Sequence, residues 1–399
     1  MNSTKNILVA ADSLDDFGGA EISSRDLIYL LSKNYKNIRF IASSSKKLRK
    51  NILKIHNKNF KGRFFSKPKN PKLLRNYRGI LNIRSLIALK KEINFYKPDI
   101  IIFNNISDQI SYSAILMAKF FKIRTLHIMR DTMGLTEGKF IYNNKKFPFK
   151  INFFFELRRS KFRFNPFKKF ITKIVLNQVD ELIAISNELK NFYEYNRVNV
   201  SHVVHNGIIL KKPFQNNYLD SNENKKIIFW PSRYSDKKGG EIIIKAFDKL
   251  NDKNIDLVIT ASISDIKNKD IVNIINKNKN IKLTGWIPKE KIDEIMNQST
   301  LVLYPSLYLE PFGRVPVEAM SFKKPVIVSN YGGLPEIVKN ENNGYVIKSI
   351  SVDKLLSKLK EIMYDDEKLN ELGKKGFEIY LKNFTGDVMV AKYIKIIEN

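Results

Sequence analysis

Short hydrophobic runs alternate with helical patterns along the first half of the chain. Each run has the length and the continuous hydrophobicity of a strand buried on both faces, and the runs lie at residues 5–11, 38–42, 99–103, 124–129 and 181–185. Apolar residues at helical spacing separate them, at 20–31 and near 107–121, and Ser186 opens a further helix. Strands separated by helices predict a parallel sheet that is covered on both faces.

The same alternation returns in the second half, after a polar stretch at 211–224 that is typical of a linker. The hydrophobic runs lie at 227–230, 255–260, 281–284, 301–304 and 325–329, and the pattern from Val352 onward is helical only. We therefore expect an α/β chain with two doubly wound, Rossmann-like domains that face a central cleft, because such sheets bind ligands beyond the carboxyl ends of their strands. The expected boundaries are 1–208 for the N-terminal domain, 209–224 for the linker, 225–380 for the C-terminal domain and 381–399 for a last helix that packs back on the N-terminal domain.

The composition excludes several classes of protein. The 399 residues suffice for about two domains, and 43% hydrophobic and 28% charged residues are globular rather than disordered proportions. The absence of cysteine excludes a disulfide framework, a thiolate metal site and a cysteine nucleophile. No stretch approaches the roughly 18–20 apolar residues of a membrane-spanning helix, and the acidic start does not fit a signal peptide. We expect a cytoplasmic chain.

The net charge of +30 is unevenly distributed. Residues 1–199 carry 26 Lys and 13 Arg against 15 acidic residues, or +24, whereas residues 200–399 carry 29 Lys and 2 Arg against 25, or +6. An anionic partner is therefore expected on the first half. The general richness in Lys, Asn and Ile is an equally good explanation of the charge, as a coding bias toward A and T.

The segment 304–320 carries the strongest chemical signal. It follows a strand and places two carboxylates, Glu310 and Glu318, eight residues apart around a Pro-Phe-Gly turn and the start of a helix. The amides of Gly313, Arg314 and Val315 at that helix start form a ready site for a phosphate. The alternative is that both glutamates are solvated surface residues.

A second cationic segment, 232–241, also follows a strand. Arg233 and Lys238 lie five residues apart on a loop that leads into a helix, which suits them to hold a diphosphate from two sides. Only two arginines occur after residue 199, Arg233 and Arg314, in a chain that otherwise uses lysine. This choice indicates that the geometry of the guanidinium group is needed.

Two glycine pairs follow strands in the same way. Gly18-Gly19 lies after the first strand and opens a helix, and Gly332-Gly333 lies after the strand at 325–329. Glycine lets a backbone approach a ligand closely, although a plain turn requires it equally. Neither pair has the spacing of a dinucleotide fingerprint or a P-loop.

These motifs together resemble the donor domain of the retaining glycosyltransferases of family 4, which have the GT-B fold. The resemblance covers residues 226–347 in order and spacing, and it is looser in the first half, where Gly18–Glu21, Ser186 and Asn206-Gly207 match. The donor-side matches are Arg233-x4-Lys238-Gly239, Thr284-Gly285-Trp286, Pro305-Ser306, Glu310-Pro311-Phe312-Gly313, Glu318-Ala319-Met320, Pro325-Val326 and Gly332-Gly333-x-Pro335-Glu336.

The resemblance implies roles for these residues toward a nucleotide-diphosphate sugar. Arg233 and Lys238 are expected to hold the diphosphate and to neutralise the leaving group, so that neither a metal nor another cofactor is needed. Glu318 is expected to bind the ribose hydroxyls, and Glu310 to hold the transferred sugar. The remaining donor contacts implied are the amides of Gly313, Arg314 and Val315, the backbone near Trp286 and Ile287 at the base, and the Gly18-Gly19 turn.

Family members retain the anomeric configuration. A front-face reaction, in which the acceptor hydroxyl enters beside the leaving phosphate, requires mainly positioning and charge stabilisation. We therefore interpret Glu310 as an orienting group first and a nucleophile second.

The acceptor side, which the resemblance assigns to the N-terminal domain, departs from the family pattern. Members often carry His-Asp at a strand end, whereas this chain has Arg130-Asp131, with His127 three residues earlier. Asp131 and His127 are the candidates, and a buried strand histidine is the alternative for His127.

The segment 150–173 combines eight Lys or Arg with seven Phe and is divided by Pro166. Two short helices of this content would lie on an anionic membrane, or their rings would pack on the sheet.

We expect a retaining glycosyltransferase at the inner face of the cytoplasmic membrane that elongates a surface glycan or a lipid-linked acceptor, such as lipopolysaccharide or capsule. A sugar-nucleotide epimerase, a phosphorylase or a basic nucleic-acid-binding protein are the alternatives. The base, sugar and acceptor cannot be read from the sequence.

Overall fold

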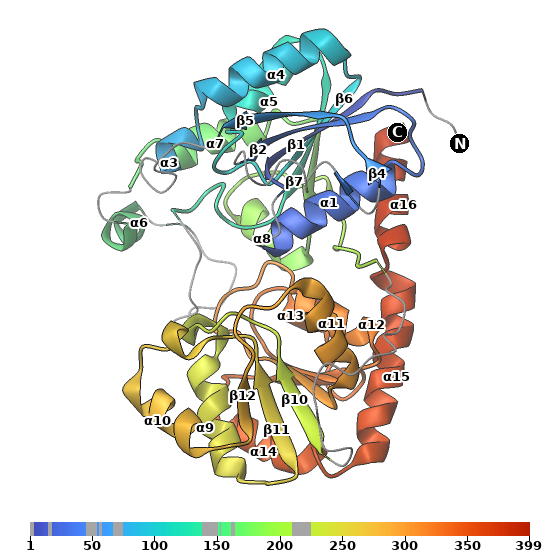
Figure 1. Ribbon diagram of the computed structural model, residues 1–399. Helices are drawn as coiled ribbons and strands as arrows, with labels where there is room; N and C mark the ends of the chain where they lie inside the picture. The colour runs from blue at the N-terminus through green and yellow to red at the C-terminus, as the bar shows by residue number, and fades with distance from the viewer. Residues whose placement is uncertain are drawn as a thin grey trace. The chain divides into compact units, whose positions relative to one another are not determined.

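The computed structural model describes residues 4–14, 18–44, 54–55, 58–66, 75–137, 151, 153–160, 164–209 and 225–399 (Figure 1). The linker expected around 211–224 and part of the segment 150–173 lie outside them. The chain divides into two compact units. Unit 1 contains the described residues before Leu210 and the final Gly386–Asn399, and unit 2 contains those of Leu210–Thr385. No helix among the described residues is long and apolar enough to cross a membrane.

Unit 1 is built on a parallel sheet of seven strands. The five strands predicted for this half are all present, and the first of them, β1, lies between β2 and β6, so that the strand order reverses there. Two short strands at the edges, β5 and β9, were not predicted because neither has a continuous hydrophobic run. In spatial order the strands are β5 (Gly62–Ser66), β2 (Ile38–Ser44), β1 (Ile7–Ser13), β6 (Ile100–Asn104), β7 (Arg124–Met129), β8 (Glu181–Ala184) and β9 (His202–Val203).

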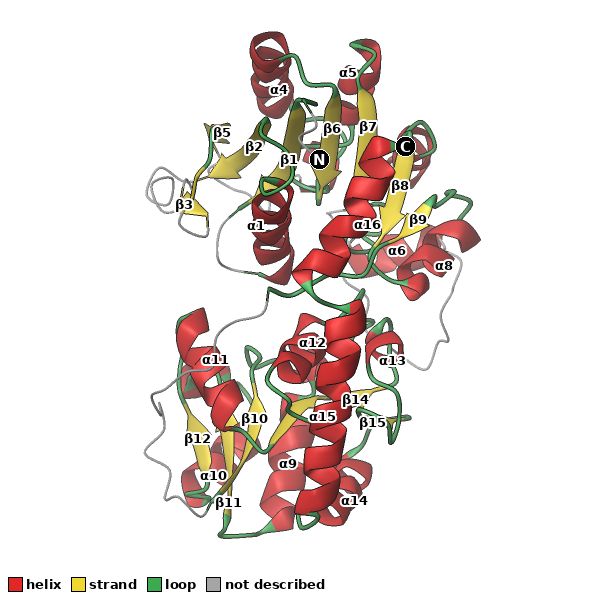
Figure 2. Ribbon diagram, turned by 90° about the vertical axis from the view of Figure 1, so that its right-hand side faces the viewer, coloured by secondary structure: helices red, strands yellow, loops and turns green. Residues whose placement is uncertain are grey.

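Helices cover both faces of this sheet (Figures 1 and 2). On one face α1 (Gly19–Leu31) packs against α16 (Gly386–Glu398), and on the other α5 (Ser113–Phe120) packs between α4 (Ile83–Tyr96) and α7 (Lys168–Leu176). The remaining described elements are α3 (Arg75–Arg78), α6 (Phe153–Ser160), α8 (Asn187–Tyr195) and the small pair β3 (Lys54–Ile55) and β4 (Lys58–Asn59). Ser186 caps α8 as predicted, accepting from the backbone N–H of Leu189 at 3.1 Å.

The helix predicted near 107–121 begins later, at Ser113. The preceding turn wraps around the buried carboxylate of Asp12, which accepts hydrogen bonds from the backbone N–H groups of Asp108, Gln109 and Ile110 at 2.8, 2.6 and 2.7 Å. These amides therefore bond to a side chain instead of starting a helix, and hydrophobic spacing cannot reveal such a contact.

The C-terminal helix α16 is tied to unit 1 at its end. The guanidinium of Arg124 donates to the carbonyl oxygens of Ile396 and Ile397, each at 2.9 Å. Glu398 accepts from Tyr35 at 2.7 Å and from Lys5 at 2.9 Å. The bonds from Arg124 satisfy carbonyl groups at the helix end that have no partner within the helix.

Unit 2 contains a parallel sheet of six strands, and it includes all five strands predicted for this half. The sixth strand, β15, is an edge strand that was not predicted. In spatial order the strands are β12 (Ile281–Leu283), β11 (Ile255–Ile259), β10 (Lys226–Trp230), β13 (Leu301–Tyr304), β14 (Val326–Ser329) and β15 (Gly344–Ile347).

The helices of unit 2 enclose a core centred on Trp230, which is fully buried. They alternate with the strands up to β15, and two long helices follow, as the purely helical pattern after Val352 predicts. The helical elements are η2 (Asp236–Lys238), α9 (Gly240–Leu250), η3 (Ile263–Asp265), α10 (Lys269–Lys277), α11 (Lys289–Gln298), α12 (Arg314–Ser321), α13 (Leu334–Ile337), α14 (Val352–Ile362) and α15 (Asp366–Asn383).

Candidate active site

The loop between β13 and α12 holds a buried carboxylate, that of Glu310, which is only 7% exposed. One oxygen, Oε1, accepts hydrogen bonds from the hydroxyl of Ser306 at 2.9 Å and from that of Tyr304 at 3.1 Å. It also forms an ion pair with the ammonium group of Lys238. Glu310 is therefore a partnered, positioned group and not a solvated surface glutamate.

Lys238 reaches Glu310 from a different loop, the one that joins β10 to α9. Its Nζ lies 2.9 Å from the hydroxyl of Tyr304, 5.0 Å from the centre of that ring and 5.6 Å from the centre of the Tyr308 ring. The ammonium group is thus held by one carboxylate, one hydroxyl and two aromatic faces.

Backbone contacts hold these two loops together. The N–H of Leu307 donates to the carbonyl oxygen of Lys237 at 2.9 Å. Gly239 has φ +82°, and a side chain there would overlap the carbonyl of Pro305. Glycine is thus required after Lys238 both for its conformation and for the close approach.

The hydroxyl of Tyr304 remains protonated in this environment. Burial raises the pKa of Tyr304 well above its usual range, and the adjacent Glu310 carboxylate raises it further. A protonated phenol donates a hydrogen bond to the carboxylate, so Tyr304 orients Glu310 at every ordinary pH.

The glycine pair Gly332-Gly333 packs against the back of the Glu310 loop. Gly332 has φ +63°, and a Cβ there would overlap the backbone of Glu310. The N–H of Gly333 donates to the carbonyl oxygen of Glu310 at 2.7 Å. This pair therefore accommodates the protein's own backbone, which decides between the two interpretations left open by the sequence.

The second carboxylate, Glu318, lies on α12 and has cationic partners of its own. It is 8% exposed, and its oxygens lie 3.5 Å from Nε of Arg314 and 3.1 Å from Nζ of Lys289. Lys289 also pairs with Asp293 at 2.5 Å. Burial lowers the pKa of Lys289, but the carboxylates of Glu318 and Asp293 outweigh that effect and raise it above its ordinary value.

The start of α12 is formed by a glycine turn, and its role as a phosphate site stays a prediction. Gly313 precedes the helix with φ +102°, and no side chain caps the first turn. Arg314 and Val315, the first two helical residues, are half-buried. Phe312 is buried and packs edge-on against Phe384 with ring centres 6.0 Å apart, which fixes the turn.

The other predicted donor residues of unit 2 lie on loops at the carboxyl ends of strands. Arg233 follows β10 and is exposed. Trp286 follows β12 and is 75% exposed, whereas its neighbour Ile287 is buried. Of the predicted diphosphate pair, the structure joins Lys238 to Glu310 and places Arg233 at the surface of the same loop.

In unit 1, His127 lies inside β7. It is 2% exposed, and its Nδ1 is 3.0 Å from the carbonyl oxygen of Phe103. Burial lowers the pKa of His127 to about 4. The ring is therefore neutral, with Nδ1–H as the donor, in the environment of a buried strand histidine.

The residues that follow β7 lie at the carboxyl end of the sheet. Arg130 is buried, and its guanidinium donates to Oδ1 of Asn104 at 2.5 Å and to Oδ1 of Asn206 at 2.7 Å. Asp131 is half-buried; its carboxylate accepts from the N–H of Met133 at 2.8 Å. Two asparagine side chains thus accept hydrogen bonds from the guanidinium of Arg130, whereas Asp131 lies nearer the surface.

The Gly18-Gly19 pair stands at the start of α1, also at the carboxyl end of its strand. Gly18 is half-buried, Gly19 is exposed, and no side chain caps the helix. The preceding residues 15–17 lie outside the described part of the chain. The described residues contain no group of three or more His, Asp or Glu side chains placed to hold a metal ion.

Sequence reasoning missed the groups that surround the two glutamates. Tyr304 and Ser306 fall within the strongest motif, but nothing in the sequence assigns them to Glu310. Asp293 is readable as a partner of Lys289 because the two are four residues apart on one helix. The link from Lys289 to Glu318 spans 29 residues and depends on the fold.

Residues 211–379, which comprise most of unit 2, match the protein family described as glycosyl transferases group 1. Among relatives, an uncharacterized glycosyltransferase of Methanocaldococcus jannaschii is 28% identical over 241 residues, which are 58% of this chain and 62% of that protein. The yeast phosphatidylinositol N-acetylglucosaminyltransferase GPI3 subunit is 25% identical over 43% of this chain and 40% of its own. The chain thus spans less than two thirds of the length of these relatives.

Solved structures match over nearly the whole chain. HepE of Anabaena, in complex with UDP and glucose, has a TM-score of 0.72 at 18% identity and covers 99% of both chains. Sucrose-phosphate synthase of Thermosynechococcus elongatus has a TM-score of 0.75 at 16% identity and covers 99% of this chain and 98% of its own. The two parallel-sheet units therefore form a GT-B fold, as the sequence predicts.

Proposed function

We propose that this chain is a glycosyltransferase that takes a sugar from a nucleotide-diphosphate sugar bound at the carboxyl ends of the unit 2 strands. The observation that carries the proposal is the cluster of Glu310, Lys238, Tyr304 and Ser306, which lies beside the open start of α12. This cluster falls within the region that matches the group 1 glycosyl transferases. HepE, a structural neighbour, binds UDP-glucose.

In this proposal Lys238 and Glu310, which form an ion pair, separate when the donor binds. Lys238 turns to the diphosphate, together with the exposed Arg233 of the same loop. The carboxylate of Glu310, still held by Tyr304 and Ser306, then accepts hydrogen bonds from hydroxyls of the sugar. The ion pair keeps both groups desolvated and positioned before binding, which reduces the reorganisation that binding requires.

The nucleoside is assigned to the α11–α12 side. Glu318 accepts hydrogen bonds from the ribose hydroxyls, and its charge is maintained by Arg314 and Lys289. The amides of Gly313, Arg314 and Val315 contact the phosphates. The backbone at Trp286 and Ile287 contacts the base.

The proposed reaction retains the anomeric configuration and uses neither a metal nor another cofactor. The bond between the anomeric carbon and the phosphate oxygen breaks, and the nucleoside diphosphate leaves with the electron pair. The acceptor hydroxyl bonds to the same face of that carbon and gives its proton to the leaving phosphate oxygen. Lys238 and Arg233 stabilise the charge that develops on the phosphate, and Glu310 orients the sugar.

We assign the acceptor to unit 1. Asp131 is the group that reaches the carboxyl end of that sheet near the surface, beside the buried Arg130, whereas His127 lies within the strand. Gly18 and Gly19, at the start of α1, are assigned to the donor and not to the acceptor. The acceptor class is a surface glycan or a lipid-linked sugar, as in lipopolysaccharide or capsule, and the enzyme works peripherally at the inner face of the cytoplasmic membrane.

A panel of nucleotide-diphosphate sugars tests this proposal. Each donor is incubated with the chain and simple sugar or lipid acceptors in the presence of EDTA, and the released nucleoside diphosphate and the sugar product are measured. The expected result is transfer from one donor, with the anomeric configuration of the donor kept in the product by NMR. Inversion, or loss of activity with EDTA, would contradict the mechanism.

The same assay separates the alternatives. An epimerase converts the donor into a different nucleotide sugar without an acceptor, and a phosphorylase consumes a glycan and phosphate. A nucleic-acid-binding protein turns over no donor and binds DNA tightly at low salt.

A further inference from the structure

The helix layer of α4, α5 and α7 is apolar on both sides. On the side toward the sheet, Leu89, Ile115 and Val175 are buried. On the opposite side, Phe120 is 82% exposed and Phe170 is 67% exposed. A helix that covers a sheet in water normally presents polar residues on its outer side, so this layer lacks the usual polar surface.

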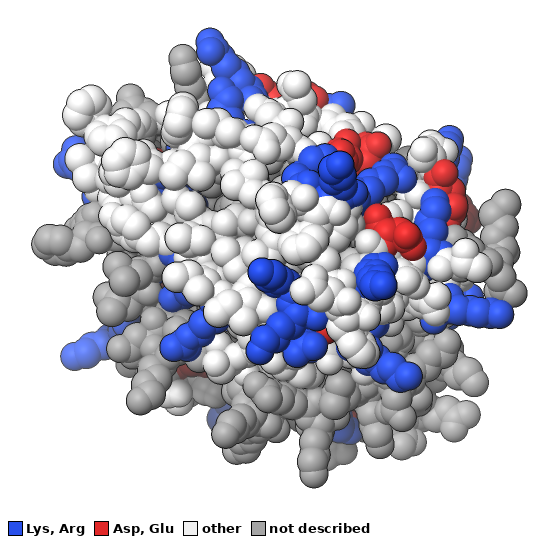
Figure 3. Space-filling model, turned by 90° about the horizontal axis from the view of Figure 1, so that it is seen from above, with Lys and Arg blue, Asp and Glu red and all other residues white. Residues whose placement is uncertain are grey.

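The exposed side chains form one stripe on each helix. Within each stripe the spacing is three or four residues, which places the side chains on the same side of the helix; Leu81 lies just before α4. Helix α5 packs directly between α4 and α7. The view onto this end of unit 1 shows a broad area without charged side chains (Figure 3). We call this surface the outer face; it consists of Leu81, Ile83, Ile87, Leu116, Phe120, Phe167, Phe170 and Ile174.

The three helices of the outer face carry exposed cations but no exposed acidic residue, although Asp180, on the loop before β8, pairs with Lys119 of α5 at 2.6 Å. Helices α4, α5 and α7 contain a single acidic residue, Glu92, which is fully buried and paired with Arg39 and Arg63. On α4, Arg84, Lys90 and Lys91 are all exposed. The surface therefore complements a partner that is both apolar and anionic.

In the segment 150–173, the rings described on α6 are exposed, whereas one of the central lysines is buried. Phe153 and Phe154 on α6 are 51% and 76% exposed, so these rings do not pack on the sheet. Lys168, in contrast, is buried; its Nζ donates to the carbonyl oxygen of Thr136 at 2.9 Å, and burial lowers its pKa. The two helices that Pro166 was predicted to separate are present as α6 and α7.

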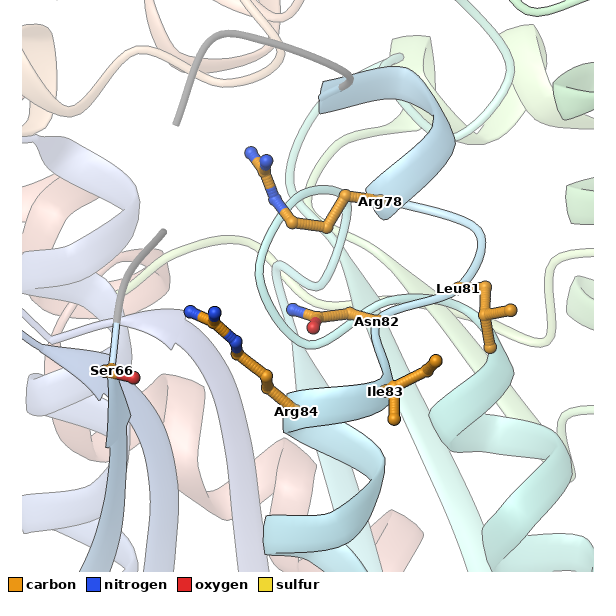
Figure 4. Close-up of a pocket in the computed structure, with 6 residues that line it drawn as sticks. All are labelled: Ser66, Arg78, Leu81, Asn82, Ile83 and Arg84. Atoms are coloured by element: carbon orange, nitrogen blue, oxygen red, sulfur yellow. The ribbon is translucent and has the colours of Figure 1, made fainter. Parts of the chain in front are cut away.

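A pocket of about 290 Å³ opens at the edge of the outer face (Figure 4). Both Arg78 and Arg84 line it, with Arg84 extending toward Ser66, and Leu81 and Ile83 are shared between the pocket and the outer face. Arg78 is paired with Asp108 at 2.5 Å. The two arginines give the pocket a cationic lining, which suits a phosphate group.

We propose that the outer face inserts into the interfacial region of an anionic phospholipid bilayer and that the Arg78–Arg84 pocket holds a headgroup phosphate. Aromatic rings and aliphatic side chains are stable at that depth, and Lys90 and Lys91 lie over the anionic headgroups. The inference rests on the proposed function in one respect: membrane binding would give the enzyme access to a lipid-linked acceptor. It assigns membrane binding to a three-helix layer and a pocket, beyond the basic segment 150–173 alone.

Flotation of the full chain with lipid vesicles tests the apolar part. Vesicles with one third phosphatidylglycerol in phosphatidylcholine are expected to carry the protein, and the double variant Phe120→Ser, Phe170→Ser is expected to bind at least about tenfold more weakly. The matched control is Leu381→Ser, an exposed leucine of unit 2. Equal binding by the wild type and the double variant, or no binding by the wild type, would overturn the proposal.

Charge variants test the electrostatic part. Lys90→Gln, Lys91→Gln and Arg84→Gln are expected to weaken binding to the anionic vesicles but not the weak binding to pure phosphatidylcholine, and added salt is expected to act in the same way. The control is Lys360→Gln, Lys374→Gln on exposed positions of unit 2. A thermal shift by inorganic phosphate alone that is lost in Arg84→Gln would assign the pocket to free phosphate instead of a headgroup.

Two further measurements separate the remaining explanations. If sedimentation velocity shows a dimer that Phe120→Ser, Phe170→Ser dissociates, and vesicles do not bind, a second copy occupies the outer face and the proposal fails. Binding of a nucleoside diphosphate to unit 2 is expected to be unchanged in all these variants. Failure of vesicle binding with intact nucleotide binding therefore contradicts this inference and leaves the proposed function standing.

Discussion

The two units share one architecture but differ in what they expose. Fourteen of the eighteen large hydrophobic side chains exposed among the described residues belong to unit 1, and four belong to unit 2. On the unit 2 helix α14 the exposed positions include Asp353, Lys354, Lys360 and Glu361. The exposed positions of α5 in unit 1 are Leu116 and Phe120. A doubly wound fold therefore does not determine its outer surface, and this difference is the basis of the proposal that unit 1 contacts an apolar partner.

The charged groups differ between the units as well. In unit 2, Lys238 with Glu310 and Lys289 with Glu318 form ion pairs in which the carboxylate is buried, at the carboxyl ends of strands. In unit 1 the polar groups at the same edge of the sheet are mostly hydrogen-bonded to neighbouring side chains. Arg130, for example, donates to Asn104 and Asn206. This difference agrees with the proposals that place the donor in unit 2 and the membrane contact on unit 1.

The largest effect is expected from the unit 2 ion pair. Lys238→Ala removes the cation assigned to the leaving diphosphate, and the transition state should lose at least about 2 and up to about 4 kcal/mol of stabilisation. The measurement is kcat/KM with the preferred donor. Lys237→Ala is the control, because Lys237 is the exposed neighbour on the same loop. Near-normal turnover in Lys238→Ala would remove the basis of the mechanism.

The next largest effect is a loss of folding stability at low pH, and it comes from His127 in unit 1. The pKa of His127 is lowered from 6.5 to about 4, so the unfolded chain binds a proton between these values and the folded chain does not. The neutral ring of His127 therefore adds to the free energy of unfolding above about pH 6.5. This contribution, about 3 kcal/mol in total, is lost as the pH falls toward 4.

Denaturant unfolding at several pH values checks this dependence. His127→Asn should flatten it, since Asn keeps a donor for the carbonyl of Phe103 but does not titrate. Asp12, whose pKa burial raises to about 8, titrates in both proteins and cancels in the comparison. An unchanged pH dependence in His127→Asn would mean that another group is responsible.

Two glycines of unit 2 with nearly the same backbone conformation sharpen the account of the Glu310 loop. Gly332 has φ +63° and Gly285 has φ +67°, but a Cβ at Gly285 meets its nearest neighbour, Oγ of Ser262, at an ordinary 3.4 Å. Gly285→Ala should cost about 1 kcal/mol of stability, from backbone strain alone. Gly332→Ala should cost at least about 2 kcal/mol and lower activity as well, because it displaces the backbone of Glu310. Equal costs in denaturant unfolding would contradict the packing described here.

The smallest effect is expected at Tyr304. Tyr304→Phe removes one hydrogen bond to Glu310 but leaves those from Ser306 and Lys238. The expected loss in kcat/KM is about 1 kcal/mol. A loss as large as that of Lys238→Ala would indicate that the phenol contacts the substrate directly.

The sequence predicted the buried strands well, because a parallel strand covered on both faces is a continuous hydrophobic run. It missed three of the four edge strands, β5, β9 and β15, whose apolar runs are short. It also missed the start of α5, where Asp12 binds the amides of the preceding turn from 96–98 residues away. The glutamates and cations of the site were readable as motifs. Their pairing was not, since Lys238 and Glu310 are 72 residues apart and meet only through the order of the strands.

The most direct test of the central claim is calorimetric titration of the chain with nucleoside diphosphates, in EDTA and without acceptor. The account predicts that one nucleoside diphosphate binds at a single site, that Lys238→Ala weakens this binding at least about tenfold, and that Lys237→Ala does not. If no nucleoside diphosphate binds, or if both variants bind as the wild type does, then the Lys238–Glu310 cluster is not a donor site.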